Sequence, residues 1–204
     1  IIQIFSLFSF LILIYFGFKL SIKLLIFILP FCLLTFFYAV PIFKGLNKNL
    51  RQIGYLKIIV IALVWSAVTV LIPFYNSELS FSYIEVIYFI QRFLIVLVLT
   101  LPFDIRDLAY DAVSLHTIPQ KIGVNKTKRL GVILMVIALV LEYALQTQDY
   151  LKSVFMLVFF MILIFLMRSN SNQSKYYSSF WVEAIPIFWV LLIVIFNIFT
   201  IVLS

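Results

Sequence analysis

The sequence contains few of the residues that a water-soluble protein carries on its surface. Of its 204 residues, 11% are charged and 65% are hydrophobic, and only 5 are Gly and 6 are Pro. Soluble domains are about a quarter charged, so this composition excludes a cytosolic enzyme, a disordered chain and a collagen-like fibre. The one cysteine, Cys32, excludes an internal disulfide. Because Cys32 lies within an apolar run, we expect it to be a small core residue.

The hydrophobic residues are arranged in long runs separated by charged and turn-forming residues. A bilayer core needs about 20 apolar residues per helix, whereas the strands of a membrane barrel alternate over about ten. We therefore predict an all-α fold, a polytopic transmembrane helical bundle that forms a single domain over residues 1–204. The seven candidate spans lie at about residues 1–18, 22–41, 57–75, 83–103, 130–146, 150–167 and 181–203.

Lys and Arg are distributed unevenly between the loops that join these spans. Eleven are in or beside the second, fourth and sixth loops, namely Lys44, Lys48, Arg51, Lys57, Arg106, Lys121, Lys126, Lys128, Arg129, Arg168 and Lys175. The opposite side has three, namely Lys19, Lys23 and Lys152. Short cytoplasmic loops carry the basic excess, so these three loops are placed in the cytoplasm of an integral protein of the bacterial inner membrane. This bias explains the net charge of +7 without a nucleic-acid partner.

The fourth loop is the one rich in carboxylates. Asp104, Asp107 and Asp111 are spaced i, i+3, i+7, so a helix continuing past the membrane boundary would place all three on one face. Mg²⁺ is bound by such oxygens together with substrate phosphate oxygens. The basic residues of the loop, including Arg106 and Lys121, would then hold the outer phosphate oxygens. The alternative is that the acids merely balance the bases on a solvated loop.

The segment 104–123 resembles the second aspartate-rich motif of the UbiA superfamily of membrane prenyltransferases. In that motif an acidic DxxxD sequence on a cytoplasmic loop is followed by Lys/Arg-Thr-Leu-Pro and a Gly. Here Asp107 and Asp111 match the acidic pair, and Thr117, Pro119 and Gly123 match the tail. A second segment, Tyr-Ala-Val-Pro-Ile-Phe-Lys at 38–44 followed by Leu-Lys at 56–57, resembles the cytoplasmic connection two helices earlier.

The resemblance implies a nine-helix bundle, of which this chain holds the later seven helices as an N-terminally truncated or divergent member. We expect two further helices and a first aspartate-rich motif upstream. It also implies Mg²⁺-dependent transfer of a prenyl group from a prenyl diphosphate to a lipophilic, aromatic, quinone-precursor-like acceptor in the bilayer. The residues implied are Asp107 and Asp111, with Asp104, as metal-binding and catalytic groups, and Tyr38, Lys44, Arg106 and Lys121 around the diphosphate.

One basic residue, Arg92, falls within the fourth span. A charge at this depth is costly, so we expect it to face the bundle interior with Glu85 or Glu142 as its partner. One interpretation is that Arg92 contacts a substrate or takes part in proton movement. The other is that it forms a buried structural pair. Two functional alternatives follow: a non-catalytic family member that binds prenyl lipids, and a small membrane transporter with an internal polar path through Arg92 and Glu142.

Overall fold

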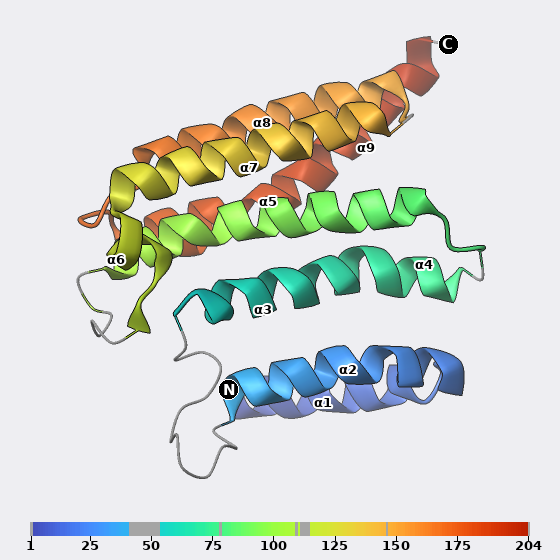
Figure 1. Ribbon diagram of the computed structural model, residues 1–204. Helices are drawn as coiled ribbons and strands as arrows, with labels where there is room; N and C mark the ends of the chain where they lie inside the picture. Colours follow the sequence, from blue (N-terminus) through green and yellow to red (C-terminus); the bar gives the residue numbers. More distant parts are fainter. Residues whose placement is uncertain are drawn as a thin grey trace.

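The computed structural model describes residues 2–40, 54–77, 79–108, 110, 115–145 and 147–203, and no strand occurs among them. Figure 1 shows the long helices lying side by side and alternating in direction along the chain. The predicted all-helical fold is confirmed for this part of the chain. In chain order the helical segments are α1 (Ile2–Gly17), α2 (Ile22–Ala39), α3 (Gly54–Ser66), η2 (Ala67–Leu71), α4 (Ile72–Asn76), α5 (Tyr83–Asp107), α6 (Ile118–Ile122), α7 (Val124–Ala144), α8 (Asp149–Arg168), η4 (Tyr177–Val182) and α9 (Ile185–Leu203).

Five helical stretches of the described chain are long and apolar enough to cross a membrane. They are Ile22–Ala39, Gly54–Asn76, Tyr83–Asp107, Asp149–Arg168 and Tyr177–Ile201. The predicted total of seven spans is not confirmed. The apolar part of α1, Gln3–Gly17, is shorter than a full span. Helix α7 lies beside α8 in the bundle, but its first turns carry the cations Lys126, Lys128 and Arg129.

Several helix starts are determined by local polar contacts. The Ser21 hydroxyl accepts a hydrogen bond from Leu24 N (3.2 Å) at the start of α2. At the start of α5, Ser82 and Glu85 form a capping box, which satisfies backbone N–H groups that have no partner within the helix. Gly123 has a φ of 81° and separates α6 from α7, a conformation that a side chain would disfavour.

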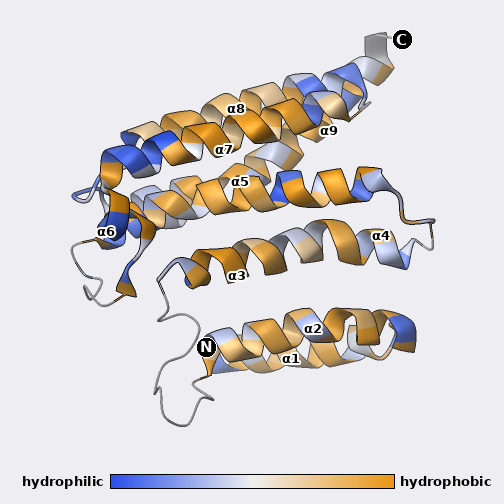
Figure 2. Cartoon of the chain, viewed as in Figure 1, coloured by the Kyte–Doolittle hydropathy of each residue, from blue (hydrophilic) through white to orange (hydrophobic). Residues whose placement is uncertain are grey.

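Polar residues gather at the end of the bundle where α3, α7 and η4 begin and where α5 and α8 finish. We call this the α6 end, because the short helix α6 lies across it (Figure 1). Figure 2 shows hydrophobic residues along the middles of the helices and hydrophilic residues around α6 and the adjacent start of α7. The basic residues of the predicted cytoplasmic loops that the structure describes therefore lie together at one end.

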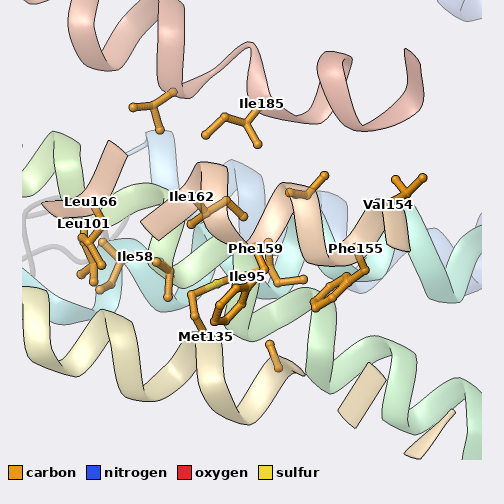
Figure 3. Close-up of a cluster of buried hydrophobic side chains, with 14 residues drawn as sticks. Ile58, Ile95, Leu101, Met135, Val154, Phe155, Phe159, Ile162, Leu166 and Ile185 are labelled. Carbon is orange, nitrogen blue, oxygen red and sulfur yellow. The ribbon is translucent and has the colours of Figure 1, made fainter. Parts of the chain in front are cut away.

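The hydrophobic core lies between α3, α5, α7, α8 and α9, as the close-up in Figure 3 illustrates. Side chains from all of these helices, including Ile95, Met135 and Phe155, are almost fully buried there. Gly131 permits the close approach of α7, because a Cβ at this position would lie 2.5 Å from Leu166 Cδ2. This packing holds α5, α7 and α8 together and so determines where the helix ends meet.

Helices α1 and α2 form a hairpin at the edge of the bundle (Figure 1). Leu24 is the buried residue of α2, and most large apolar side chains of α1 are more than half exposed. In a bilayer these side chains would contact lipid, which is as apolar as a protein core. Cys32 is exposed on α2, so its prediction as a core residue is wrong. An apolar run alone does not distinguish a core-facing from a lipid-facing position.

Candidate functional site

A buried ion pair joins the first turn of α3 to the last turn of α5 at the α6 end. Lys57 Nζ lies 2.9 Å from Asp104 Oδ1. The Asp104 side chain is 1% exposed and that of Lys57 is 20% exposed. A carboxylate so removed from water requires a nearby cation. The alternative of a solvated acidic loop is therefore wrong for Asp104, which is an internal part of the bundle.

The start of α3 also contacts the segment that precedes α6. A Cβ on Gly54 would overlap the Leu115 carbonyl oxygen and would lie 2.7 Å from that of His116. These neighbours are backbone atoms, which cannot rotate away as a side chain can. Only glycine therefore allows the chain around residues 54 and 115 to approach this closely.

We expect Gly54→Ala to lower the free energy of unfolding by about 1–3 kcal/mol, the usual range for overpacking a close contact. Gly17→Ala is the matched control, because nothing lies within 4 Å of a Cβ built at that position. Thermal unfolding of both variants in detergent measures the difference. Equal stability of the two variants would contradict the close backbone approach at Gly54.

Helix α6 places a second cation beside α3. The Gln120 side chain accepts a hydrogen bond from Thr117 N (3.0 Å), which organises the first turn of α6. Lys121 Nζ then lies 4.9 Å from the centre of the Tyr55 ring. A cation over an aromatic face is attracted by the ring quadrupole. Lys121, from the stretch that carries part of the family resemblance, thus contacts Tyr55, two residues before Lys57.

Asp107 lies one turn beyond Asp104 in α5, as the i, i+3 spacing predicts. It accepts two hydrogen bonds from Arg106, from Nε to Oδ1 (2.7 Å) and from Nη2 to Oδ2 (3.2 Å). The Asp107 side chain is 27% exposed, so this carboxylate reaches the surface of the α6 end while Asp104 does not. The guanidinium of Arg106 also lies 5.4 Å from the centre of the Phe103 ring.

The connection between α8 and η4 covers the end of α5. Gln173 Nε2 donates to the Pro102 carbonyl (2.8 Å) and to Ser178 Oγ (2.6 Å). These bonds attach the sixth predicted loop to the helix that carries Asp104 and Asp107. The second, fourth and sixth loops are thus linked at one end of the molecule.

The described residues do not by themselves fit the predicted Mg²⁺. No group of three His, Cys, Asp or Glu side chains in the described part is placed to hold a metal ion. Asp104 faces Lys57 and Asp107 faces Arg106, so each of these carboxylates already has a cation beside it. Asp111 lies outside the described residues. Mg²⁺ binding therefore stays a prediction, and no chemical step is derived from it.

Tyr38, another residue from the sequence prediction, is not joined to this cluster in the described part of the chain. Tyr38 lies near the end of α2 and is half-buried. Within the described part of the chain, no hydrogen bond or ion pair links it to Lys57, Asp104 or Lys121. Lys44 lies outside the described residues.

Arg92 contacts an aromatic ring rather than an acid. Its guanidinium carbon lies 4.1 Å from the centre of the Trp189 ring, contributed by α9, and its Nε is buried without a hydrogen bond. Among the described residues Arg92 forms no ion pair within 4.0 Å. The predicted partner Glu85 is instead held at the start of α5 by Ser82, with its Oε2 2.7 Å from Ser82 N.

The other predicted partner, Glu142, belongs to a buried hydrogen-bond network between α5 and α7. Its Oε2 accepts from Gln91 Nε2 (2.7 Å) and its Oε1 accepts from Thr147 Oγ1 (3.1 Å). Gln91 is 1% exposed and Glu142 is 5% exposed. Buried polar groups satisfied in this way specify how two helices pack.

Sequence reasoning did not select Tyr55, Gln91 or Trp189 as site residues. Gln91 gave a usable signal, because an amide inside an apolar span needs a hydrogen-bond partner. Tyr55 and Trp189 gave none, since aromatic residues occur throughout this chain. Their roles depend on which helices become neighbours.

No protein-family model, curated protein or solved structure matches this chain. The functional argument therefore depends on the residues and their geometry.

Proposed function

We propose that this chain is a UbiA-like membrane prenyltransferase whose diphosphate site lies at the α6 end. One observation carries the proposal: the start of α3, which includes Lys57 of the earlier resembling segment, lies beside Asp104 and residues 115–121 of the later one. Lys57 pairs with Asp104 at 2.9 Å, Gly54 lies against the backbone of residues 115–116, and Lys121 lies over Tyr55. Nothing in the sequence spacing of the two segments requires this contact.

The site offers cations where a diphosphate leaving group would need them. When the allylic C–O bond of a prenyl diphosphate breaks, negative charge grows on the diphosphate oxygens. The ammonium of Lys121 is exposed at the α6 end, and the guanidinium of Arg106 lies beside Asp107. Fixed positive charge aimed at developing negative charge lowers the barrier. The prenyl carbon then bonds to an aromatic carbon of the acceptor, which loses a proton.

The apolar helices supply the remainder of the proposed reaction environment. Five helical stretches suited to a bilayer adjoin the polar end of the bundle, so an isoprenoid tail can lie among apolar side chains while its diphosphate remains at the surface. Exclusion of water from this region protects a reactive allylic cation from hydrolysis. The proposed localisation is the bacterial inner membrane, with the α6 end in the cytoplasm, in agreement with the basic residues gathered there.

The transporter alternative has no specific support in the described residues. Glu142 is engaged by Gln91 and Thr147, and Arg92 is stacked on Trp189. Through these contacts, Arg92 and Glu142 join neighbouring helices, which explains both residues without a transport path. The non-catalytic alternative shares the proposed site and differs from an enzyme only in turnover.

A diphosphate-release assay on the full chain in liposomes distinguishes the enzyme from the non-catalytic prenyl-lipid-binding protein. Farnesyl diphosphate is supplied with and without an aromatic acceptor such as 4-hydroxybenzoate or a dihydroxynaphthoate, and its binding is measured in parallel. We expect release that requires an acceptor, with prenylated product detected by mass spectrometry. Binding without release for every acceptor would indicate a prenyl-lipid-binding protein. Neither binding nor release would contradict the proposed site.

A further inference from the structure

A second candidate site, with both cationic and apolar lining, lies on α7 beside the end of α8. It is an open groove of about 540 Å³. Its lining residues are Asn125, Lys128, Arg129, Val132, Ile133 and Met167. It shares none of these with the Lys57, Asp104 and Lys121 cluster, so it is separate from the proposed diphosphate site.

The polar wall of the groove is cationic. Lys128 Nζ donates a hydrogen bond to the Met167 carbonyl oxygen (2.7 Å), which fixes the ammonium between α7 and the end of α8. Arg129 is exposed beside it. Neither cation forms an ion pair with any residue that the structure describes, and the lining contains no carboxylate. The groove therefore presents two uncompensated positive charges with several N–H donors, a combination that suits a phosphate group.

The apolar wall continues the groove along an exposed apolar face of α7. Val132 and Ile133 follow Arg129 at i+3 and i+4, which places them on the same helix face. Farther along that face, Val136 is 46% exposed and Val140 is 63% exposed. Val140 lies about 16 Å along the helix axis from Arg129, at 1.5 Å per residue. The two cations thus lie at one end of an exposed apolar track that runs along α7 toward the middle of the bundle.

This arrangement matches the layout of one ligand class, a lipid with an anionic headgroup and long acyl chains. We propose that the groove binds an anionic phospholipid, with its headgroup phosphate between Lys128 and Arg129 and an acyl chain along Ile133, Val136 and Val140. Basic pockets between membrane helices at the cytoplasmic side commonly bind such headgroups. A soluble phosphate compound would use the two cations but would gain nothing from the apolar track.

The defined position of Lys128 distinguishes it from basic residues that only determine the orientation of a membrane protein. A loop lysine that only sets orientation needs no defined neighbour, whereas Lys128 is attached to the carbonyl of another helix and forms the wall of a groove. The site is independent of the proposed enzymatic function, because lipid binding here requires no turnover at the α6 end.

Native mass spectrometry of the full chain in neutral detergent tests the proposal, with phosphatidylglycerol and phosphatidylcholine titrated separately. We expect one phosphatidylglycerol to bind in preference to phosphatidylcholine. Arg129→Gln and Lys128→Gln should each weaken phosphatidylglycerol binding about fivefold. This is the affinity that one basic residue typically contributes near an anionic lipid surface. Arg129→Lys should retain binding. Lys175→Gln is the control, because Lys175 is exposed at the same end but does not line the groove.

Three outcomes would overturn the proposal. The first is equal binding of the two lipids, and the second is an equal loss in Lys175→Gln and Arg129→Gln. The third is binding of sn-glycerol 1-phosphate as tight as that of phosphatidylglycerol, because a soluble phosphate would then be the ligand. Arg129 is exposed, so its substitution leaves packing intact and the test remains decisive if Lys128→Gln proves unstable.

Discussion

Lys121→Met is expected to lower kcat/KM for prenyl transfer by about 10²–10³-fold, the usual effect of removing one group that stabilises developing charge. The ammonium of Lys121 lies over Tyr55 at the α6 end, beside the segment that contains Asp104 and Asp107. Steady-state release of diphosphate at varied farnesyl diphosphate concentration gives kcat and KM separately. Lys126→Met, which removes an exposed charge five residues later, should leave both values within about twofold of wild type.

The ring of Tyr55 provides a second variant pair for the same prediction. Tyr55→Phe preserves the aromatic face below the ammonium, so transfer should be unchanged. Tyr55→Ala removes the ring and should lower kcat/KM by about two- to fivefold, in line with an exposed cation–π contact. Wild-type activity of both Tyr55→Ala and Lys121→Met would contradict a role for Tyr55 and Lys121 in prenyl transfer.

Lys57→Met is expected to lower the free energy of unfolding by about 3–5 kcal/mol, because it removes the cation 2.9 Å from a carboxylate that is 1% exposed. Unfolding in detergent, followed by circular dichroism, measures the loss. The double variant Lys57→Met with Asp104→Leu should recover most of it, since a buried ion pair replaced as a unit by apolar residues is often neutral.

Another ion pair of the described chain serves as the control for this prediction. Lys152 pairs with Asp149 at 3.4 Å, and the Asp149 side chain is fully exposed. Lys152→Met should therefore not change stability measurably, because exposed pairs contribute little. A loss from Lys152→Met as large as that from Lys57→Met would contradict the structural importance of the buried pair, as would a double variant less stable than Lys57→Met alone.

The helical membrane fold was predictable because it depends on composition and run length. The number of spans was not, since α7 combines an apolar face with the cations Lys126, Lys128 and Arg129 in its first turns. Hydropathy alone cannot decide whether such a helix crosses the bilayer fully. The orientation of Cys32 was likewise beyond the sequence, because lipid-facing and core-facing surfaces are both apolar.

For the candidate site, the sequence predicted the segments but not the pairs within them. The i, i+3 relation of Asp104 and Asp107 is local and follows from helix geometry. The contact of Lys57 with Asp104 joins residues 47 positions apart and depends on α3 packing against α5. One error was avoidable, because the Ser-x-x-Glu pattern at 82–85 predicts a capping box that occupies Glu85.

The measurement that tests the central claim most directly is the binding of a non-hydrolysable farnesyl thiodiphosphate to the full chain, compared with farnesol and with inorganic diphosphate. We expect the thiodiphosphate to bind more tightly than either fragment, because the α6 end holds the charged group while the apolar helices hold the tail. We also expect binding at least tenfold weaker in Lys121→Met than in Lys126→Met. Equal binding of farnesol and the thiodiphosphate, unaffected by Lys121→Met, would contradict a diphosphate site at the α6 end.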